Sequence, residues 1–275
     1  MMSDVLTNPK ADRVRQVHAL TTRPARRRTG RFLVEGPQAV REVVKASSVT
    51  LRAVYLTEAS AHRYPEIAAE ATRRGVSPQH GTPEVLAAMS GDAQEVVAVA
   101  DQVDVPLDQA LAGSPRLVAV LVEGRDPGNV GTVLRAADAA GADAVLLAGD
   151  SVDLHNPKVV RATAGSLFHL PVAVRVPVES LGETLRDAGL TVLAAAGDGQ
   201  HDLDDLLDGA LSDAPDLSAP TAWLFGNEAQ GLTDEVQRTA DATIRIPVYG
   251  AAESLNLATA AAVCLYASAR TQRKG

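Results

Sequence analysis

The sequence predicts an α/β protein in which a mostly parallel sheet follows a smaller α/β unit. Short apolar segments, typical of strands, alternate with helical segments along most of the chain. Many of these strand segments are apolar at nearly every position, as expected for parallel strands covered by helices on both faces. The segment 106–116 carries two prolines and a glycine, and we interpret it as a linker between the two units.

The first unit is expected over residues 31–105, after a basic N-terminal arm over residues 1–30. Its opening segment, RFLVEGPQAVREVVKA, indicates a strand, a turn at Gly36-Pro37 and an amphipathic helix. After this segment, short strands and helices continue to alternate through the rest of the unit. Further strands are predicted at 51–57 and 95–103, with helices at 65–75 and 82–91 between them.

The second unit is expected over residues 117–275. It is predicted to end in a long helix from about Ser254 to Arg270, and the acidic, turn-rich stretch 197–220 is expected to be a surface excursion. Its helices and strands alternate, so a parallel sheet covered on both faces is the expected architecture. The predicted strands are 117–122, 143–148, 172–176, 191–196, 222–225 and 243–247.

Composition limits the classes of function. The chain has 275 residues, of which 46% are hydrophobic and 22% charged, as in ordinary globular proteins. The N-terminus lacks the apolar core of a secretory signal, and no apolar stretch approaches the roughly 20 residues that span a bilayer. The single cysteine, Cys264, excludes an internal disulfide and a cysteine-rich metal site, and the six histidines show no ligand spacing. We therefore expect a cytoplasmic protein with no membrane segment and no metal ion.

The net charge of −8 hides an uneven distribution. Residues 1–45 carry ten lysines and arginines against four acidic residues, whereas the remainder carries 16 against 30. Clustered arginines bind phosphate oxygens and displace counterions from nucleic acid, although a solvated terminal arm would show the same charges. The candidate phosphate contacts in this cluster are Arg23, Arg26, Arg27, Arg28 and Arg31.

A glycine-containing loop lies in the stretch VEGRDPGNVGTVLRAADAAGA, which follows a predicted strand and opens a helix. Its glycines, Gly124, Gly128 and Gly131, suggest a nucleotide-binding loop. The lysine of a P-loop is lacking, however, and the glycine spacing departs from the dinucleotide fingerprint. An NAD(P)-binding loop with Asp150 as the ribose-binding carboxylate stays open as an alternative.

Polar side chains gather where three predicted strands end. In the glycine-containing stretch, Asn129 is either a helix N-cap or a functional amide, and Arg135 either forms a surface ion pair or takes part in chemistry. The segment AWLFGNEAQGLTDE places Glu228 directly after a buried strand, where burial would be costly. In IPVYGAAESLNLATAAAV, Ser254 can cap the last helix, whereas Asn256 has no structural need to be an amide. Such an arrangement is typical of ligand sites in open α/β sheets.

Three ordered motifs carry a resemblance that covers nearly the whole chain. They are EGRDPGNVGTVLRAADAAGADAVLL, LFGNEAQGL and IPVYGAAESLNLATAAAV, accompanied by NPKVVRATAGSLFHLPV after the first and by RFLVEGPQAVREVV near the N-terminus. In these motifs the chain resembles the SpoU (TrmH) family of RNA 2′-O-ribose methyltransferases, within the SPOUT superfamily. The resemblance implies a trefoil-knotted parallel-sheet domain preceded by a small RNA-binding α/β domain of the L30e-like type.

The resemblance also implies S-adenosylmethionine as cofactor, held by the knotted C-terminal loops and not by the glycine-containing loop. Apolar walls suit the adenine of this cofactor, and Ile246 and Leu255 can supply them. Backbone groups of residues 194–199 are expected to add contacts. The residues that match the family's donor pocket are Gly226, Asn227, Ile246, Pro247 and Leu255.

Five polar residues match the family's catalytic positions. Asn129 and Arg135 match its catalytic asparagine and arginine, and Glu228, Ser254 and Asn256 match the remaining polar positions. Because a guanidinium stays protonated in proteins, we expect Arg135 to orient RNA and to stabilise the developing oxyanion, not to act as a base. Glu228 is expected to orient Arg135, and Ser254 and Asn256 to contact the donor or the ribose.

The resemblance further implies an RNA substrate, either ribosomal RNA or tRNA, and a homodimer with the site near its interface. Lys158 and Arg161 are three residues apart and would share one helix face, which suits RNA phosphates but equally an ordinary exposed basic face. Two other functions stay open at this stage: an NAD(P)-dependent oxidoreductase, and a catalytically silent RNA-binding protein.

Overall fold

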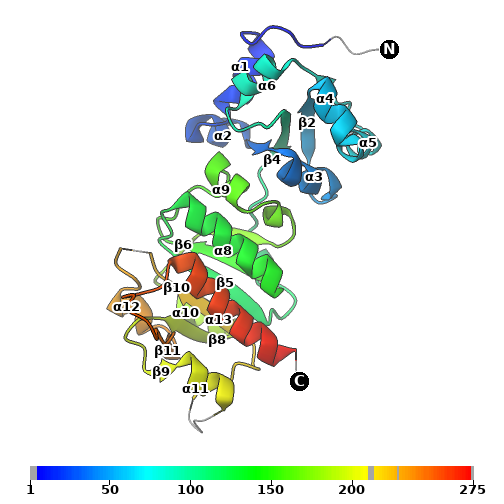
Figure 1. The fold of residues 1–275 in the computed structure, drawn as a ribbon. Coiled ribbons are helices and arrows are strands. Elements are labelled where there is room, and N and C mark those ends of the chain that lie inside the picture. Colours follow the sequence, from blue (N-terminus) through cyan, green and yellow to red (C-terminus); the bar gives the residue numbers. More distant parts are fainter. Residues whose placement is uncertain (1–4, 210–213, 228, 274–275) are drawn as a thin grey trace. The chain divides into compact units, whose positions relative to one another are not determined.

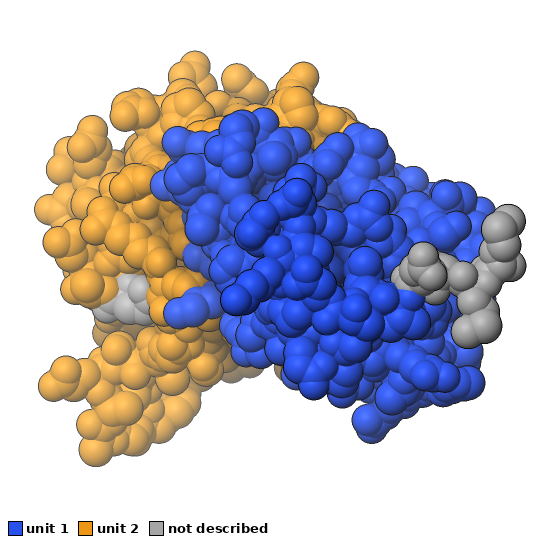
Figure 2. All heavy atoms as spheres, turned by 90° about the horizontal axis from the view of Figure 1, so that it is seen from above, with its two compact units in different colours: residues 1–103, 153–169 blue, residues 104–152, 170–275 orange. Residues whose placement is uncertain are grey.

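The computed structural model describes residues 5–209, 214–227 and 229–273, and its ribbon is drawn in Figure 1. The chain forms two compact units, which Figure 2 colours separately. Unit 1 comprises residues 1–103 and 153–169, and unit 2 comprises residues 104–152 and 170–275. The boundary lies after residue 103, whereas the first unit was expected to end at residue 105. Unit 1 additionally contains a segment from the second half of the chain, which sequence patterns did not separate from its neighbours.

Unit 1 is built on a four-stranded sheet with the strand order β1-β4-β2-β3. β4 pairs antiparallel with both β1 and β2, whereas β3 lies parallel to β2. The strands are β1 (Arg31–Glu35), β2 (Leu51–Leu56), β3 (Gln79–His80) and β4 (Val96–Asp101). The helices are α1 (Asp12–Ala19), α2 (Arg23–Thr29), α3 (Pro37–Lys45), α4 (Glu58–Arg63), α5 (Pro65–Arg73), α6 (Pro83–Met89) and α9 (Pro157–Ala162), with a 3₁₀ turn at Ser166–Phe168.

The predicted N-terminal arm is helical and packed. Val14 and Val17 of α1 and the following Leu20 are buried in a core that also contains Leu33 of β1 and Val85 of α6. The apolar residues of α1 recur at a spacing of three, so the helix buries one face. The separation of residues 1–30 as an arm is therefore wrong, because these three apolar side chains attach the segment to the sheet of unit 1.

Unit 2 is built on a seven-stranded sheet with the order β7-β6-β5-β10-β8-β11-β9, in which every named pair is parallel. The strands are β5 (Leu117–Val122), β6 (Ala144–Ala148), β7 (Val172–Val176), β8 (Thr191–Ala195), β9 (His201–Asp202), β10 (Thr221–Phe225) and β11 (Ala242–Arg245). The chain moves outward from β5 to β7 and then builds the other half of the sheet beyond β10. Ligands bind beyond the carboxyl ends of strands at such a reversal of direction.

Helices cover both faces of this sheet, as the apolar strands predicted. On one face α8 (Pro127–Ala140) and α13 (Leu257–Gln272) pack side by side, as Figure 1 shows, and the indole of Trp223 on β10 donates to Ser268 of α13 over 2.9 Å. On the other face, α7 (Leu107–Ala110), α10 (Leu181–Asp187) and α12 (Asp234–Gln237) share a core with Val118 and Val120 of β5. The remaining helix is α11 (Leu203–Asp208), within the acidic excursion.

Two of the predicted element ends that differ from the structure have a local cause. The last strand ends at Arg245 instead of residue 247, since Pro247 has no amide hydrogen to donate to a neighbouring strand. The last helix begins at Leu257 instead of Ser254, because Asn256 is its N-cap. Over the described ranges, no helix is long and apolar enough to cross a membrane.

Candidate active site

A cavity of about 770 Å³ lies in unit 2, beyond the carboxyl ends of β8, β10 and β11. Its walls come from the segments that follow these strands and from the start of α13. Seven of the residues selected from the motifs line it, namely Gly226, Asn227, Ile246, Pro247, Ser254, Leu255 and Asn256. The three strand ends are adjacent in the sheet but up to about fifty residues apart in sequence, so only the β10-β8-β11 strand order brings these side chains together.

Close backbone packing shapes the wall formed by the segment after β10. A Cβ on Gly226 would overlap the backbone of Gly231 and Leu232, so only glycine fits there. The side-chain oxygen of Asn227 accepts hydrogen bonds from the amides of Ala229 and Gln230, at 3.1 and 2.8 Å. This turn holds the loop closed, and it gives the predicted donor-pocket asparagine a structural task as well.

A second close approach lies in the segment after β8. A Cβ on Gly199 would contact the backbone of Ile244 and Arg245 in β11, and Ala195, Ala196 and Gly197 line the cavity just before it. Three residues of the 194–199 segment therefore line the cavity, and backbone contacts from this segment to a ligand stay a prediction.

Asn256 joins the cavity to the glycine-containing stretch. Its side-chain oxygen accepts from the amides of Ala258 and Thr259, and its side-chain nitrogen donates to Oδ1 of Asn129 over 3.1 Å. The expectation that Ser254 caps this helix is wrong, because α13 begins only at Leu257 and its first free amides lie within reach of residue 256. Asn256 thus has a structural role that the sequence argument had denied it.

Asn129 and Arg135 both lie on α8, which α13 covers on one side. The N-cap of α8 is Asp126, whose carboxylate accepts from the Asn129 amide over 2.8 Å, so the Asn129 side chain is not needed as a cap. Its oxygen faces Asn256 instead. Arg135 is exposed, nearly two turns farther along the helix. The predicted partner Glu228 lies outside the described residues.

The cavity lining also includes residues that were not selected as site residues from the sequence, among them Arg245 and Tyr249. Arg245 lines the cavity and forms a bidentate pair with Asp202 of β9, at 2.7 and 2.9 Å. Tyr249 also lines it and is 86% exposed, with its hydroxyl hydrogen-bonded to Asp204 of α11. That hydrogen bond raises the pKa of Tyr249. Asp202 and Asp204 belong to the acidic excursion 197–220. No local sequence pattern indicated that this excursion would pair with Arg245 and Tyr249.

The glycines of the glycine-containing stretch serve packing. A Cβ on Gly124 would press on Val130, and Gly131 is buried within α8. None of Gly124, Gly128 and Gly131 lines the cavity. These contacts do not favour the NAD(P)-binding alternative, since the cavity lies at other strands.

The predicted RNA contacts fall into two groups. Arg23, Arg27, Arg28, Arg31 and Lys158 are exposed. Arg26 is 2% exposed and donates to the carbonyls of Leu20 and Thr21 and to Asp153. Burial alone would raise the pKa of Asp153, but the hydrogen bond and charge of Arg26 outweigh it and hold that pKa below its ordinary value. Arg26 is therefore an interior residue that cannot reach RNA in this structure.

Arg161 is also engaged within unit 1. It pairs with the buried Glu35 at 2.6 Å and with Asp92 at 3.0 Å, and its side chain is 34% exposed. Lys158 and Arg161 therefore do not form the shared basic face that was expected. Arg161 is paired with carboxylates, whereas Lys158 is exposed and has no carboxylate partner among the described residues.

Comparison with known proteins adds independent findings. The model of the SpoU rRNA Methylase family matches residues 116–266, and that of the MRM3-like substrate binding domain matches residues 11–98. The chain is 31% identical to the 23S rRNA (guanosine(2553)-2′-O)-methyltransferase RlmP of Bacillus subtilis over 270 residues, which cover 95% of this chain and 97% of that relative.

Two further matches agree in kind. Over 186 residues the chain is 38% identical to the 23S rRNA (uridine(2479)-2′-O)-methyltransferase of Streptomyces viridochromogenes; the match covers 66% of this chain and 62% of that relative, which is less than two thirds of its length. The crystal structure of an AdoMet-bound rRNA methyltransferase from Sinorhizobium meliloti superposes with a TM-score of 0.82 at 30% identity and covers 98% of both chains.

Proposed function

The chain belongs to the SpoU rRNA methylase family, and on that premise we propose that it transfers the methyl group of S-adenosylmethionine to a ribose 2′-hydroxyl of ribosomal RNA. The proposal rests chiefly on the cavity in unit 2. Residues of the second and third motifs line this cavity, and Asn129 of the first motif is hydrogen-bonded to the lining residue Asn256. The names of both curated relatives specify 2′-O-methylation of 23S rRNA, which supports large-subunit rRNA as the substrate.

The residues of the cavity fit S-adenosylmethionine. Its volume of about 770 Å³ is ordinary for a site that takes a small molecule. Ile246 and Leu255 provide apolar walls for an adenine, while Ser254 and backbone groups of the segment after β10 provide polar partners. When bound, this cofactor supplies an electrophilic methyl group. We assign its binding to Gly226, Asn227, Ile246, Pro247 and Leu255.

Arg135 and Asn129 are proposed to act on the RNA. A ribose hydroxyl is a weak nucleophile, and negative charge develops on its oxygen as it attacks. The guanidinium of Arg135 remains protonated, so it stabilises this charge and orients the adjoining phosphate. Asn129, held by Asn256, fixes the ribose by a hydrogen bond, and phosphate or water accepts the proton. Glu228 is assigned to orient Arg135, and Ser254 to contact the donor or the ribose.

Unit 1 is proposed to bring the RNA to the site. Residues 11–98 match the substrate binding domain, α1 and α2 included, which supports a substrate-binding role for this part of unit 1; an L30e-like fold for it is our inference from the family resemblance. The exposed residues Arg23, Arg27, Arg28, Arg31 and Lys158 are the phosphate contacts that we retain from the sequence. Arg26 and Arg161 are left out because their guanidinium groups are engaged inside the unit.

We also propose that the protein is a homodimer. Val263 and Tyr266 of α13 are 38% and 52% exposed, which leaves an apolar strip that a second copy would cover. Sedimentation equilibrium should give twice the chain mass of 28.6 kDa. Val263→Asp should yield monomers, and a wild type that sediments as a monomer at micromolar concentration would contradict this part of the proposal.

A trefoil knot through the C-terminal loops of unit 2 is the topology we infer for this dimerising domain, and the close approach of Gly199 to β11 fits such a crossing. A cytoplasmic location follows from the ribosomal substrate. Both inferences rest on the family relationship.

Two measurements test the proposed activity. Calorimetry with S-adenosylmethionine and with NAD should show binding of the first only, and the reverse result would restore the oxidoreductase alternative. Transfer of a labelled methyl group to 23S rRNA, followed by mapping of 2′-O-methyl sites, should locate one modified ribose. Binding of donor and RNA without any transfer would instead support the catalytically silent alternative.

A further inference from the structure

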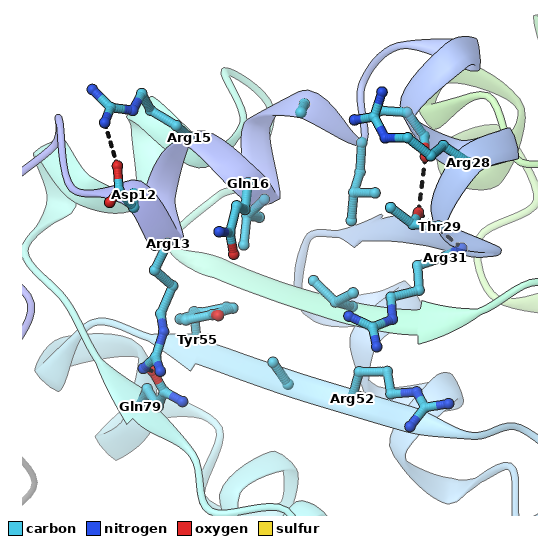
Figure 3. Close-up of a pocket in the computed structure, with 16 residues that line it drawn as sticks. Asp12, Arg13, Arg15, Gln16, Arg28, Thr29, Arg31, Arg52, Tyr55 and Gln79 are labelled. Atoms are coloured by element: carbon cyan, nitrogen blue, oxygen red, sulfur yellow. Dashed lines mark hydrogen bonds and ion pairs between the residues drawn. The ribbon is translucent and has the colours of Figure 1, made fainter.

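A second cavity, of about 540 Å³, is lined only by residues of unit 1. It lies between helices α1 and α2 and the strands β1, β2 and β4, and Figure 3 shows its side chains. Five arginines line it, against a single acidic residue, Asp12. We call this cavity the arginine groove; its arginines are Arg13, Arg15, Arg28, Arg31 and Arg52. Only Arg28 and Arg31 belong to the cluster selected from the sequence.

One end of the arginine groove concentrates positive charge. Arg52 forms a bidentate pair with Asp101 at 2.8 and 2.5 Å, and Arg31 lies 3.8 Å from the same carboxylate. The hydrogen bond from Arg52 holds the pKa of Asp101 below its ordinary value, so this carboxylate stays ionised. The single negative charge of Asp101 is thus shared by two arginines, Arg31 and Arg52. Arg28 lines the same cavity and forms no ion pair with any described residue, so this end carries a net positive charge.

The other end offers one more cation and two neutral polar groups. Arg13 donates to the side chain of Gln79 over 2.5 Å and, among the described residues, pairs with no carboxylate. Figure 3 shows its side chain hanging from α1 beside Tyr55. Burial raises the pKa of Tyr55, so its hydroxyl stays neutral near pH 7. Arg15 adds little here, because it is paired with Asp12.

Between the two ends the lining is apolar. Val17 and Leu20 from α1 and its following turn, together with Ala53 and Val99 from adjacent strands, form this part; Ala53 is partly exposed, whereas the other three belong to the core of unit 1 and expose only 5–6% of their surface. Apolar surface flanked by cations is what a nucleic-acid strand requires when its bases face the protein and its phosphates lie at the edges. In a duplex the base faces are stacked on one another, so this apolar lining would gain nothing from double-stranded RNA.

We propose that the arginine groove binds an unpaired stretch of the RNA substrate, with Arg13 and Arg28 on two phosphates and a base or ribose on the apolar lining. The proposal rests on the proposed function in that it takes RNA as the substrate. It goes further by naming the form of RNA and by adding Arg13 and Arg52, which no sequence argument had selected. The cluster of residues 23–28 then contributes chiefly through Arg28.

The test compares two double variants of the full-length protein. Arg13→Gln with Arg28→Gln removes both unpaired charges of the groove, and Lys10→Gln with Arg63→Gln removes two exposed charges elsewhere in unit 1. The probes are a fluorescein-labelled single-stranded RNA 12-mer and a blunt duplex of the same sequence, measured by fluorescence anisotropy from 50 mM to 300 mM KCl. Circular dichroism verifies that each variant is folded.

Each phosphate contact to a single strand contributes about 0.7 to the salt slope. The groove variant should therefore bind the single strand with a slope shallower by about 1.4, which corresponds to about tenfold weaker binding near 0.15 M salt. The control variant should change affinity less than twofold, and duplex binding should change equally little in both. The proposal would be overturned if the groove and control variants lost single-strand affinity equally. It would also be overturned if the groove variant kept wild-type affinity, and a protein ligand for the groove would then be the next candidate.

Photo-crosslinking with 4-thiouridine RNA gives a second readout that needs no variant. Crosslinked peptides should contain lining residues of α1, α2 or β2, and crosslinks confined to other surfaces would overturn the proposal. These measurements are independent of methyl transfer. If the wild type failed to bind S-adenosylmethionine while RNA bound in the groove, the proposed function would fail and the groove would stand.

Discussion

Asn256 offers a substitution that separates the folding role of a residue from its role in the site. Its side-chain oxygen caps α13, accepting from the amides of Ala258 and Thr259 at 2.9 and 3.4 Å, while its nitrogen donates to Asn129 over 3.1 Å. In Asn256→Asp the carboxylate can still cap the helix, and the helix dipole favours its charge. The donor to Asn129 is lost. Asn256→Ala removes both functions.

The magnitudes follow from these contacts. Loss of an N-cap costs about 1 kcal/mol, so Asn256→Ala should lower the melting temperature by about 2–4 °C, whereas Asn256→Asp should melt within about 1 °C of the wild type. One positioning hydrogen bond contributes about 1 kcal/mol, which is about a fivefold change in rate. Both variants should therefore show kcat lowered by about fivefold or more.

The assays are differential scanning fluorimetry and transfer of a labelled methyl group to 23S rRNA at saturating donor. A positioning role predicts that kcat falls more than the KM for the donor changes. If Asn256→Asp keeps wild-type kcat, the contact with Asn129 has no part in the reaction. If it melts as low as Asn256→Ala, the cap has been misassigned.

Three further predictions follow from the structure. Arg135→Ala should lower turnover at least about a hundredfold while calorimetry shows unchanged donor binding, and near-normal methylation would remove Arg135 from the site. Arg26→Ala should destabilise the protein by about 3 kcal/mol in urea unfolding, since it removes the arginine partner of the partly buried Asp153 and leaves that carboxylate with the His155 amide as its hydrogen-bond donor. Because the folded-state pKa of Asp153 is lowered, this loss should be complete at neutral pH and shrink as the pH falls below about 4; a pH-independent difference would refute the pairing. Gly226→Ala should weaken donor binding at least about tenfold, because its Cβ has no room in the closed loop, whereas the matched Gly250→Ala, with open space around it, should bind normally.

The strands and most helices of unit 2 could be predicted from the sequence, because each is a continuous local pattern. Apolar runs such as 117–122 are strands within one residue of the expected bounds. Exceptions arose where a single side chain decides the end of an element. Asn256 and Asp126 both took the N-cap position that had been considered for a neighbour, since several polar residues near a helix start can satisfy its free amides and only backbone geometry selects one.

The basic cluster shows the limit of charge patterns. Five arginines in nine positions indicated a phosphate-binding surface, yet Arg26 is buried against Asp153, a residue 127 positions away. Conversely, Arg13 and Arg52 lie in the arginine groove although neither stands out in the sequence. Exposure and pairing depend on long-range packing, which a local count of charges does not contain.

By itself, the sequence determined the alternation of strands and helices, the three motifs and thereby the family, because these are carried by short segments whose meaning does not depend on distant contacts. Only the tertiary structure decided which motif residues share a cavity and which basic residues stay exposed. The order β10-β8-β11 places the ends of three strands side by side, and α13 brings Asn256 to Asn129. The physical reason is that strand order and helix packing are set by burial of apolar faces across the whole unit, and polar side chains meet where that packing places them.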